Sequence, residues 1–249
     1  MCRQIFKVAL ASIVPVLTLS AGDDFVSFYG KAGNSSNHMQ SEKSINSISA
    51  FKELESTLKK LANLGDLKSL LALGALYEQS FNFQDGTSIK PDITEARRHY
   101  ESAAKKNSSL AFFKLAMQDV SSGNFDSAYI KFKKSATAKT DPSFVPAAVA
   151  LSSLTMDKYQ SDTKKLLDAS NILKPIADKA DLPTAFFVLA NNYNLLGQDA
   201  AASKYLTAAC KSKNAPKEIT TFCYGGGADI TDQRGRKVGD TNTSQTCGN

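Results

Sequence analysis

The stretch from Leu64 to Asn107 constrains the fold of this chain more than any other, because it carries two apolar patterns with the period of an α-helix. The first pattern repeats every three or four residues, at Leu67, Leu70, Leu71, Gly74 and Tyr77. The second does the same at Ile93, Ala96, Tyr100, Ala103 and Ala104. Such spacing places each set on one face of a helix, so we expect two amphipathic helices joined by a polar loop.

One such pair cannot cover both of its apolar faces, so it needs similar pairs stacked beside it. Weaker copies of the pattern follow at 108–139, 141–179 and 180–215. Leucines at equivalent positions of the four copies are separated by 42, 36 and 38 residues: Leu73, Leu115, Leu151 and Leu189. A single helix from Ile48 to a glycine stop at Gly65 would be a half-repeat that caps the stack. Residues 45–224 are therefore predicted to form an all-α, right-handed α-solenoid of about four helix-turn-helix pairs.

The first copy resembles the Sel1-like repeats, a subgroup of the tetratricopeptide-like superfamily. Its motif residues follow the family order L-G-x-x-Y, D, A, Y, A-A: Leu73-Gly74, Tyr77, Asp92, Ala96, Tyr100 and Ala103-Ala104. The segment from Leu173 to Ala177, with Pro175 inside it, resembles the family variant L-x-P-L-A. The resemblance covers roughly Ala50 to Ala215, and the second and third copies lack the L-G-x-x-Y motif. It implies a superhelical stack whose concave surface binds extended peptides or another protein.

The N-terminus has the pattern of a secretory signal peptide. Arg3 and Lys7 precede an apolar run from Val8 to Leu19, and Ser20-Ala21-Gly22 follows as a small-residue cleavage site. We expect residues 1–22 to direct export and to be removed, with an uncleaved anchor as the alternative. No membrane span is expected after this removal. Residues 23–44, rich in Ser, Asn and Gly, are predicted to be a flexible arm.

Three cysteines remain after residue 22, and export would place them where disulfides persist. Cys210 and Cys223 both lie in the patterned region, whereas Cys247 lies in a polar segment. We therefore favour a Cys210–Cys223 disulfide, with free thiols as the alternative and the pairing of Cys247 left open. Residues 225–249 begin with three glycines and have no apolar period, so they are predicted to be a flexible polar tail.

The charge pattern does not favour nucleic acid as a partner. The formal charge is +6, and it falls to +4 when Arg3 and Lys7 leave with the signal peptide. Nine of the 30 bases cluster on the predicted second helices: Arg97, Arg98, Lys105, Lys106, Lys131, Lys133, Lys134, Lys164 and Lys165. They are either the solvated faces of those helices or a positive stripe for an acidic partner or polysaccharide.

The sequence offers little for catalysis, so we expect no enzyme, no metal and no cofactor. Its two histidines are His38, in the predicted arm, and His99, which we expect on a helix surface. Two Ser-x-x-Lys matches, Ser56 to Lys59 and Ser161 to Lys164, resemble the motif of penicillin-interacting serine enzymes, although no Lys-Thr-Gly follows. A β-lactam-binding or cell-wall-active serine enzyme therefore stays an alternative function.

The pattern as a whole favours an exported, periplasmic scaffold, adaptor or regulator that binds a protein partner in the cell envelope without turnover. The alternative within the same fold is a secreted effector or host-contact protein. We expect contacts with the partner at polar positions of the first helices: Glu78, Gln118, Asn191, Asn192 and Asn194.

Overall fold

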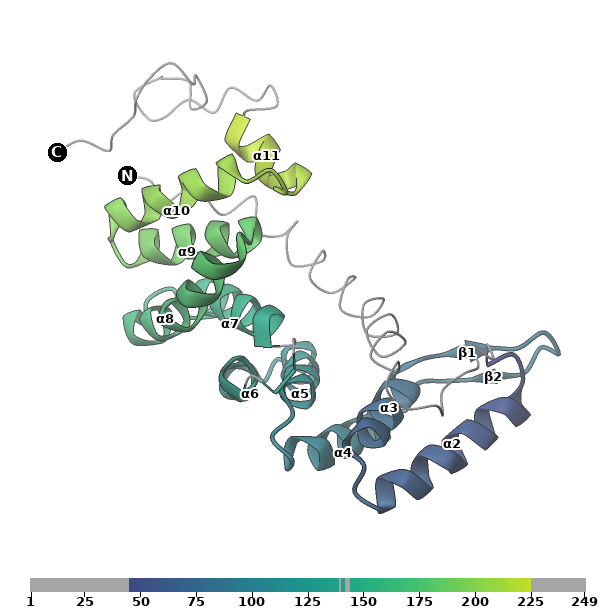
Figure 1. The fold of residues 1–249 in the computed structure, drawn as a ribbon. Coiled ribbons are helices and arrows are strands. Elements are labelled where there is room, and N and C mark those ends of the chain that lie inside the picture. Colours follow the sequence, from purple (N-terminus) through teal and green to yellow (C-terminus); the bar gives the residue numbers. More distant parts are fainter. Residues whose placement is uncertain (1–44, 139, 142–143, 225–249) are drawn as a thin grey trace. The chain divides into compact units, whose positions relative to one another are not determined.

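The computed structural model describes residues 45–138, 140–141 and 144–224 (Figure 1). Its helices are α2 (Ile48–Asn63), α3 (Leu67–Glu78), α4 (Ile93–Ala104), α5 (Ser109–Ser121), α6 (Phe125–Ala138), α7 (Phe144–Lys158), α8 (Thr163–Ala180), α9 (Pro183–Leu195), α10 (Asp199–Lys211) and α11 (Lys217–Tyr224). A two-stranded ladder of β1 (Phe81–Asn82) and β2 (Ser88–Ile89) lies between α3 and α4 in the chain. The predicted signal peptide, arm and tail, with His38 and Cys247, lie outside the described residues.

The described chain is mostly helical, as the apolar periods predict, and helices that follow one another pack together. The closest packing joins α3 with α4, α5 with α6, and α9 with α10, while α2, α4 and α8 each pack on the helix that follows. The chain divides into two compact units, with the boundary after Ala147 inside α7. Among the described helices, none has the length and apolar character needed to cross a membrane.

Side-chain caps and glycines set the ends of these helices where the sequence places them. Asp66 begins α3 by accepting a hydrogen bond from the Ser69 amide at 2.7 Å, and Asp92 begins α4 through the Glu95 amide at 3.0 Å. Gly65 follows α2 with a φ of +83°, a left-handed conformation that glycine adopts without steric cost. Gly123, between α5 and α6, and Gly197, between α9 and α10, also have positive φ values, of +75° and +71°.

The core of the first unit is made by the predicted faces of α3 and α4 together with α5. Its members are buried side chains from the three helices: Leu70, Leu71, Ala96, Tyr100, Ala103, Leu110, Ala111 and Leu115. Ile93, predicted to lie on the same face, is instead 50% exposed because it starts the first turn of α4. Leu67, Tyr77 and Ala104 are partly buried against this core, and the other predicted positions are buried, which confirms the helical faces that the spacing predicted.

The connection between α3 and α4 is not the polar loop that we expected, because it contains the β1–β2 ladder. Phe81 pairs with Ile89, and Asp85-Gly86 forms the turn, with Gly86 at a φ of +79°. Phe81 lies edge-on to Phe51 of α2, with ring centroids 5.3 Å apart, and Phe83 is buried beside Phe51. The hairpin therefore covers the apolar face of α2, which we expected the neighbouring helices alone to cover.

In the second unit, α9 is the most enclosed helix, since α8, α10 and α11 all pack against it. Tyr193 of α9 stacks on Tyr205 of α10, with centroids 5.6 Å apart and planes 11° apart. Pro175 lies inside α8, where the sequence placed it.

The last helix, α11, was not predicted. The Cys210–Cys223 disulfide joins it to α10, with the two Cα atoms 5.6 Å apart, as the sequence favoured. Ile219 is 1% exposed, and Phe222 packs edge-on to Phe187 of α9 at a centroid distance of 5.3 Å. This short helix is therefore held by one covalent link and a small apolar contact.

Candidate binding site

Two of the predicted contact residues, Glu78 and Gln118, meet in a polar cluster that crosses three helices. Glu78 Oε2 accepts from the Tyr100 hydroxyl and from Lys114 Nζ, each at 2.9 Å. Glu78 Oε1 accepts from Gln118 Nε2 at 3.1 Å. Both residues are only partly exposed. The cluster thus links α3, α4 and α5, and its carboxylate is already occupied by groups of the protein.

Asn191 and Asn192, also predicted as contact residues, do not lie on the surface. They are 2% and 0% exposed, because the helices around α9 cover this part of it on several sides. Asn191 Nδ2 donates to the Phe187 carbonyl at 2.8 Å, one turn earlier in the helix. Asn194, at the end of α9, is half-buried. Of the three asparagines, only Asn194 can be reached from outside.

Ser56 and Ser161, the serines of the two Ser-x-x-Lys matches, are both exposed. Ser56 lies on α2, and Ser161 precedes α8. Lys59 Nζ, the group that would activate Ser56, donates instead to Glu55 Oε1 at 2.8 Å. In the described structure, Lys59 is therefore engaged by Glu55 and is not placed as a free base for Ser56.

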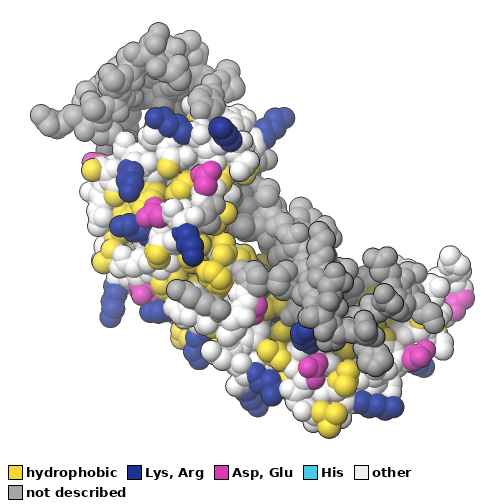
Figure 2. All heavy atoms as spheres, in the orientation of Figure 1, with side chains coloured by type: hydrophobic (Ala, Val, Ile, Leu, Met, Phe, Trp, Pro, Cys, Tyr) yellow, Lys and Arg dark blue, Asp and Glu magenta, His cyan; other side chains and the backbone are white. Residues whose placement is uncertain are grey.

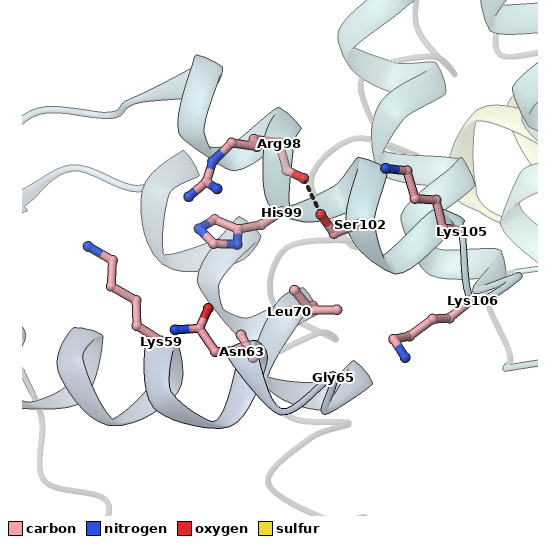
Figure 3. Close-up of a pocket in the computed structure, with 10 residues that line it drawn as sticks. Lys59, Asn63, Gly65, Leu70, Arg98, His99, Ser102, Lys105 and Lys106 are labelled. Carbon is pink, nitrogen blue, oxygen red and sulfur yellow. Dashed lines mark hydrogen bonds between the residues drawn. The ribbon is translucent and has the colours of Figure 1, made fainter.

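An open pocket of about 640 Å³ lies in the first unit where the end of α2, the start of α3 and the face of α4 meet (Figure 3). Ten residues line it: Lys59, Ala62, Asn63, Gly65, Leu70, Arg98, His99, Ser102, Lys105 and Lys106. The lining holds four bases and no Asp or Glu, so we name it the basic pocket. Its positive potential favours an anionic ligand.

His99 is the buried polar side chain of the basic pocket, contrary to the surface position that we expected. It is 6% exposed, and its ring stacks on Tyr77 with centroids 5.6 Å apart and planes 3° apart. No group in the described part of the chain hydrogen-bonds to Nε2, since Glu95 Oε2 lies 3.8 Å away. Burial lowers the pKa of His99, and the charge of Arg98 lowers it further. The imidazole is therefore neutral at pH 7, with an unused polar atom.

The four bases of the pocket differ in how far they are neutralised. Lys59 pairs with Glu55, and Arg98 pairs with Glu95, each at 2.8 Å. Lys105 and Lys106 are exposed, and no described carboxylate forms an ion pair with either. Two full positive charges thus remain open at one end of the pocket.

A solvent-exposed leucine, Leu64, lies next to this pocket. Its side chain is 84% exposed, and its chain neighbours Asn63 and Gly65 both line the pocket. Leu61, also in the last turn of α2, is 44% exposed. The pocket therefore combines a cationic lining with an apolar edge.

Sequence reasoning named Arg98, Lys105 and Lys106 as surface bases but did not bring them together. A signal was present, because Arg98, Ser102 and Lys105 are spaced by four and three residues and so share one face of α4. Lys59 and His99 could not have been added from the sequence, since they join the site only through the packing of α2 and α3 against α4.

The rest of the surface shows no comparable concentration of charge in the view drawn. Figure 2 shows Lys and Arg side chains spread over that face with Asp and Glu side chains among them. Arg97 and Lys131, two bases of the predicted stripe, both bind Asp119. Within the described ranges, no three His, Cys, Asp or Glu side chains lie close enough together to hold a metal ion. Neither the protein-family models nor the curated proteins compared with this chain match it.

Proposed function

We propose that this chain is an exported, periplasmic scaffold or adaptor that binds a protein partner in the cell envelope without turnover. The observation that carries the proposal is the packing of consecutive helices into side-by-side pairs, an arrangement that builds binding surface from several elements. We further propose that the pairs α3/α4, α5/α6, α7/α8 and α9/α10 are Sel1-like repeats of a right-handed solenoid. The four leucines aligned between the copies support this, because each is at most 2% exposed.

Export is supported by the signal-peptide pattern and by the Cys210–Cys223 disulfide, since such bonds persist mainly in oxidising compartments. The absence of turnover is supported by Glu78, whose carboxylate is bound by three neighbours and so is not placed as a free base. A secreted effector or host-contact protein would share all these features and differs only in where the protein is found.

The test is to crosslink a tagged full-length chain inside cells, fractionate the cells, and identify what is recovered with it by mass spectrometry. We expect the tagged protein in the periplasm with one envelope protein in near-equal amount. A version without residues 2–22 is the matched control. It should lose both the periplasmic location and the envelope protein recovered with it. Free protein in the medium with no envelope partner would support the secreted alternative and contradict the envelope adaptor.

The serine-enzyme alternative has its own test, a gel of the purified protein treated with labelled penicillin. We expect no covalent label. Label that disappears in Ser56→Ala or Ser161→Ala would overturn the proposal that the protein binds without turnover.

A further inference from the structure

We propose that the basic pocket binds an acidic segment of a partner protein. Carboxylates of that segment would lie among the four bases and His99, and one of its apolar side chains would contact Leu64. The inference rests on the proposed function for one point only, that the occupant is a protein. The pocket itself, its charge and its lining belong to the described structure.

The first step of the argument is charge. Lys105 and Lys106 lie on adjacent positions at the end of α4, and neither has a described carboxylate as an ion-pair partner. Lys106 Nζ turns toward the α2–α3 turn, where it would lie 3.3 Å from a Cβ at Gly65. Arg98 lies two turns earlier on the same helix (Figure 3). Carboxylates that enter the pocket would therefore gain charge-assisted hydrogen bonds from several donors at once.

The second step is the unused polar atom of His99. A buried polar group without a partner costs free energy unless a ligand or water supplies the missing hydrogen bond. Figure 3 draws His99 among Lys59, Asn63 and Arg98, which all line the same pocket. The neutral imidazole can donate from Nε2 to an incoming carboxylate oxygen. A ligand of this kind would satisfy the atom that the protein leaves open.

The charges around His99 make its protonation sensitive to such a ligand. Lys59 of α2 and Glu95 and Arg98 of α4 act on its charge, and Tyr77 of α3 stacks on its ring. Glu55 of α2 lies one contact further away, where it binds both Lys59 and Tyr77. A bound carboxylate would add a negative charge at Nε2 and favour the protonated form. Binding of an acidic ligand should therefore raise the pKa of His99.

The third step is the apolar edge, which favours a peptide over a simple anion. Leu64 is 84% exposed beside the pocket, and Leu61 adds a second exposed apolar side chain one turn before it. Burying a leucine side chain against an apolar group of the ligand stabilises the complex, a gain that inorganic phosphate cannot provide. A volume of about 640 Å³ also admits more than one side chain. An acidic segment that carries an apolar residue therefore matches the site in charge, size and polarity.

The experiment measures fluorescence anisotropy of a labelled peptide, Glu-Leu-Glu-Glu-Leu-Glu, with the purified full-length protein. The Gln-Leu-Gln-Gln-Leu-Gln peptide is the charge control, and we expect it to bind at least tenfold more weakly. The double variant Lys105→Gln/Lys106→Gln should weaken binding of the acidic peptide at least tenfold. The matched variant Lys174→Gln/Lys179→Gln removes the same charge from exposed positions of α8 and should change binding less than twofold.

The role of the apolar edge is tested by Leu64→Ser, which should weaken binding at least threefold while the fold is kept, since this side chain is almost fully exposed. Inorganic phosphate and phosphatidylglycerol vesicles serve as competitors. Equal losses in the two lysine variants would show attraction by net charge alone and overturn the proposal. Displacement of the peptide by submillimolar phosphate, or by vesicles, would overturn it in favour of a phosphate or lipid headgroup.

A crosslinking experiment in cells separates failure of this inference from failure of the proposed function. If the wild-type chain recovers a partner and Lys105→Gln/Lys106→Gln recovers equal amounts, the scaffold stands and the pocket is not its contact site. If the wild-type chain recovers no partner, the scaffold itself is wrong. We expect recovery by the wild type and by Lys174→Gln/Lys179→Gln, and a loss of at least tenfold with the pocket variant.

Discussion

The ring of Tyr100 lies directly against the backbone of Gly74, so that a Cβ on Gly74 would be only 2.5 Å from Tyr100 Cε1. Tyr100 is 0% exposed, and its hydroxyl is fixed by Glu78 at 2.9 Å. The glycine of α3 and the tyrosine of α4 are therefore needed together, because the small residue makes the space that the ring fills. This gives a physical reason for the joint presence of L-G-x-x-Y and the later tyrosine in the first copy.

The first prediction concerns Gly74→Ala. Alanine favours a helix over glycine by about 1 kcal/mol, but the added methyl group would overlap a ring that cannot move, and such overpacking costs about 1–3 kcal/mol. We expect the overlap to dominate and the free energy of unfolding to fall by up to about 2 kcal/mol, measured by urea denaturation. Ser56→Ala on the exposed face of α2 is the control and should change it by less than about 0.5 kcal/mol. A gain in stability for Gly74→Ala would contradict the close contact.

The second prediction concerns Asp119, a carboxylate that is 2% exposed. It accepts hydrogen bonds from Arg97 at 2.9 Å, from Ser127 at 2.6 Å and from Lys131. Removing one partner of a buried charge pair commonly costs about 3–5 kcal/mol, because the other charges stay buried without it. Arg97 and Lys131 are partly exposed here, so we expect Asp119→Asn to lower the free energy of unfolding by about 2–3 kcal/mol in urea.

The same residue predicts how stability depends on acid. Burial raises the pKa of Asp119, but hydrogen bonds from Lys131, Ser127 and Arg97 together bring it below the ordinary value of 3.8. A carboxylate with a lowered pKa stabilises the fold above 3.8, and this contribution is lost as the pH falls through the lowered value. Urea melts at pH 5, 4 and 3 should therefore show a smaller loss for Asp119→Asn than for the wild type. Parallel losses would show that Asp119 is not the group that titrates.

The third prediction concerns a higher pH range, where His99 titrates. Burial lowers its pKa below 6.5, so the unfolded chain binds a proton that the folded chain does not. Stability should therefore fall as the pH is lowered from 7 through 6.5 toward the pKa of the folded protein. His99→Phe keeps a ring that can stack on Tyr77, and its stability should change less between pH 7 and 5. An unchanged pH dependence in His99→Phe would contradict the buried neutral imidazole.

The fourth prediction concerns the disulfide between α10 and α11. The bond closes a loop of sequence separation 13, for which the loss of chain entropy is worth about 3 kcal/mol at most. Because α11 has few other contacts, we expect Cys210→Ser/Cys223→Ser to release this helix before the rest unfolds. Hydrogen exchange should rise in 217–224 and stay slow near Phe187 and Leu189. Mass spectrometry of non-reduced peptides should show Cys210 joined to Cys223, and a peptide with Cys247 bound to either would contradict the pairing.

The helical faces could be predicted because burial repeats with the helical period, as Leu71, Ala96 and Tyr100 show. The hairpin was missed although Asp85-Gly86 between short apolar segments is a strong turn signal, because its strands are only two residues long. The burial of Asn191 and Asn192 was missed for another reason. We expected polar residues of a first helix to lie on the surface. This expectation fails for α9, because other helices cover it on several sides.

The binding pocket was the least predictable part. Its bases on α4 are visible in the sequence, but its shape depends on where α2 and α3 pack, and no local pattern gives that. The same holds for His99, which lies between Arg98 and Tyr100 in the sequence but has Tyr77 and Lys59 as neighbours in space.

The most direct test of the account is native mass spectrometry of the purified chain mixed with the envelope partner that crosslinking identifies. The account predicts a complex of fixed stoichiometry in which both proteins keep their masses after prolonged incubation. A partner that leaves with a changed mass would show turnover, and the absence of any complex would show that the chain is not a scaffold for that partner. Either of these results would contradict the proposal that the protein acts by stoichiometric binding.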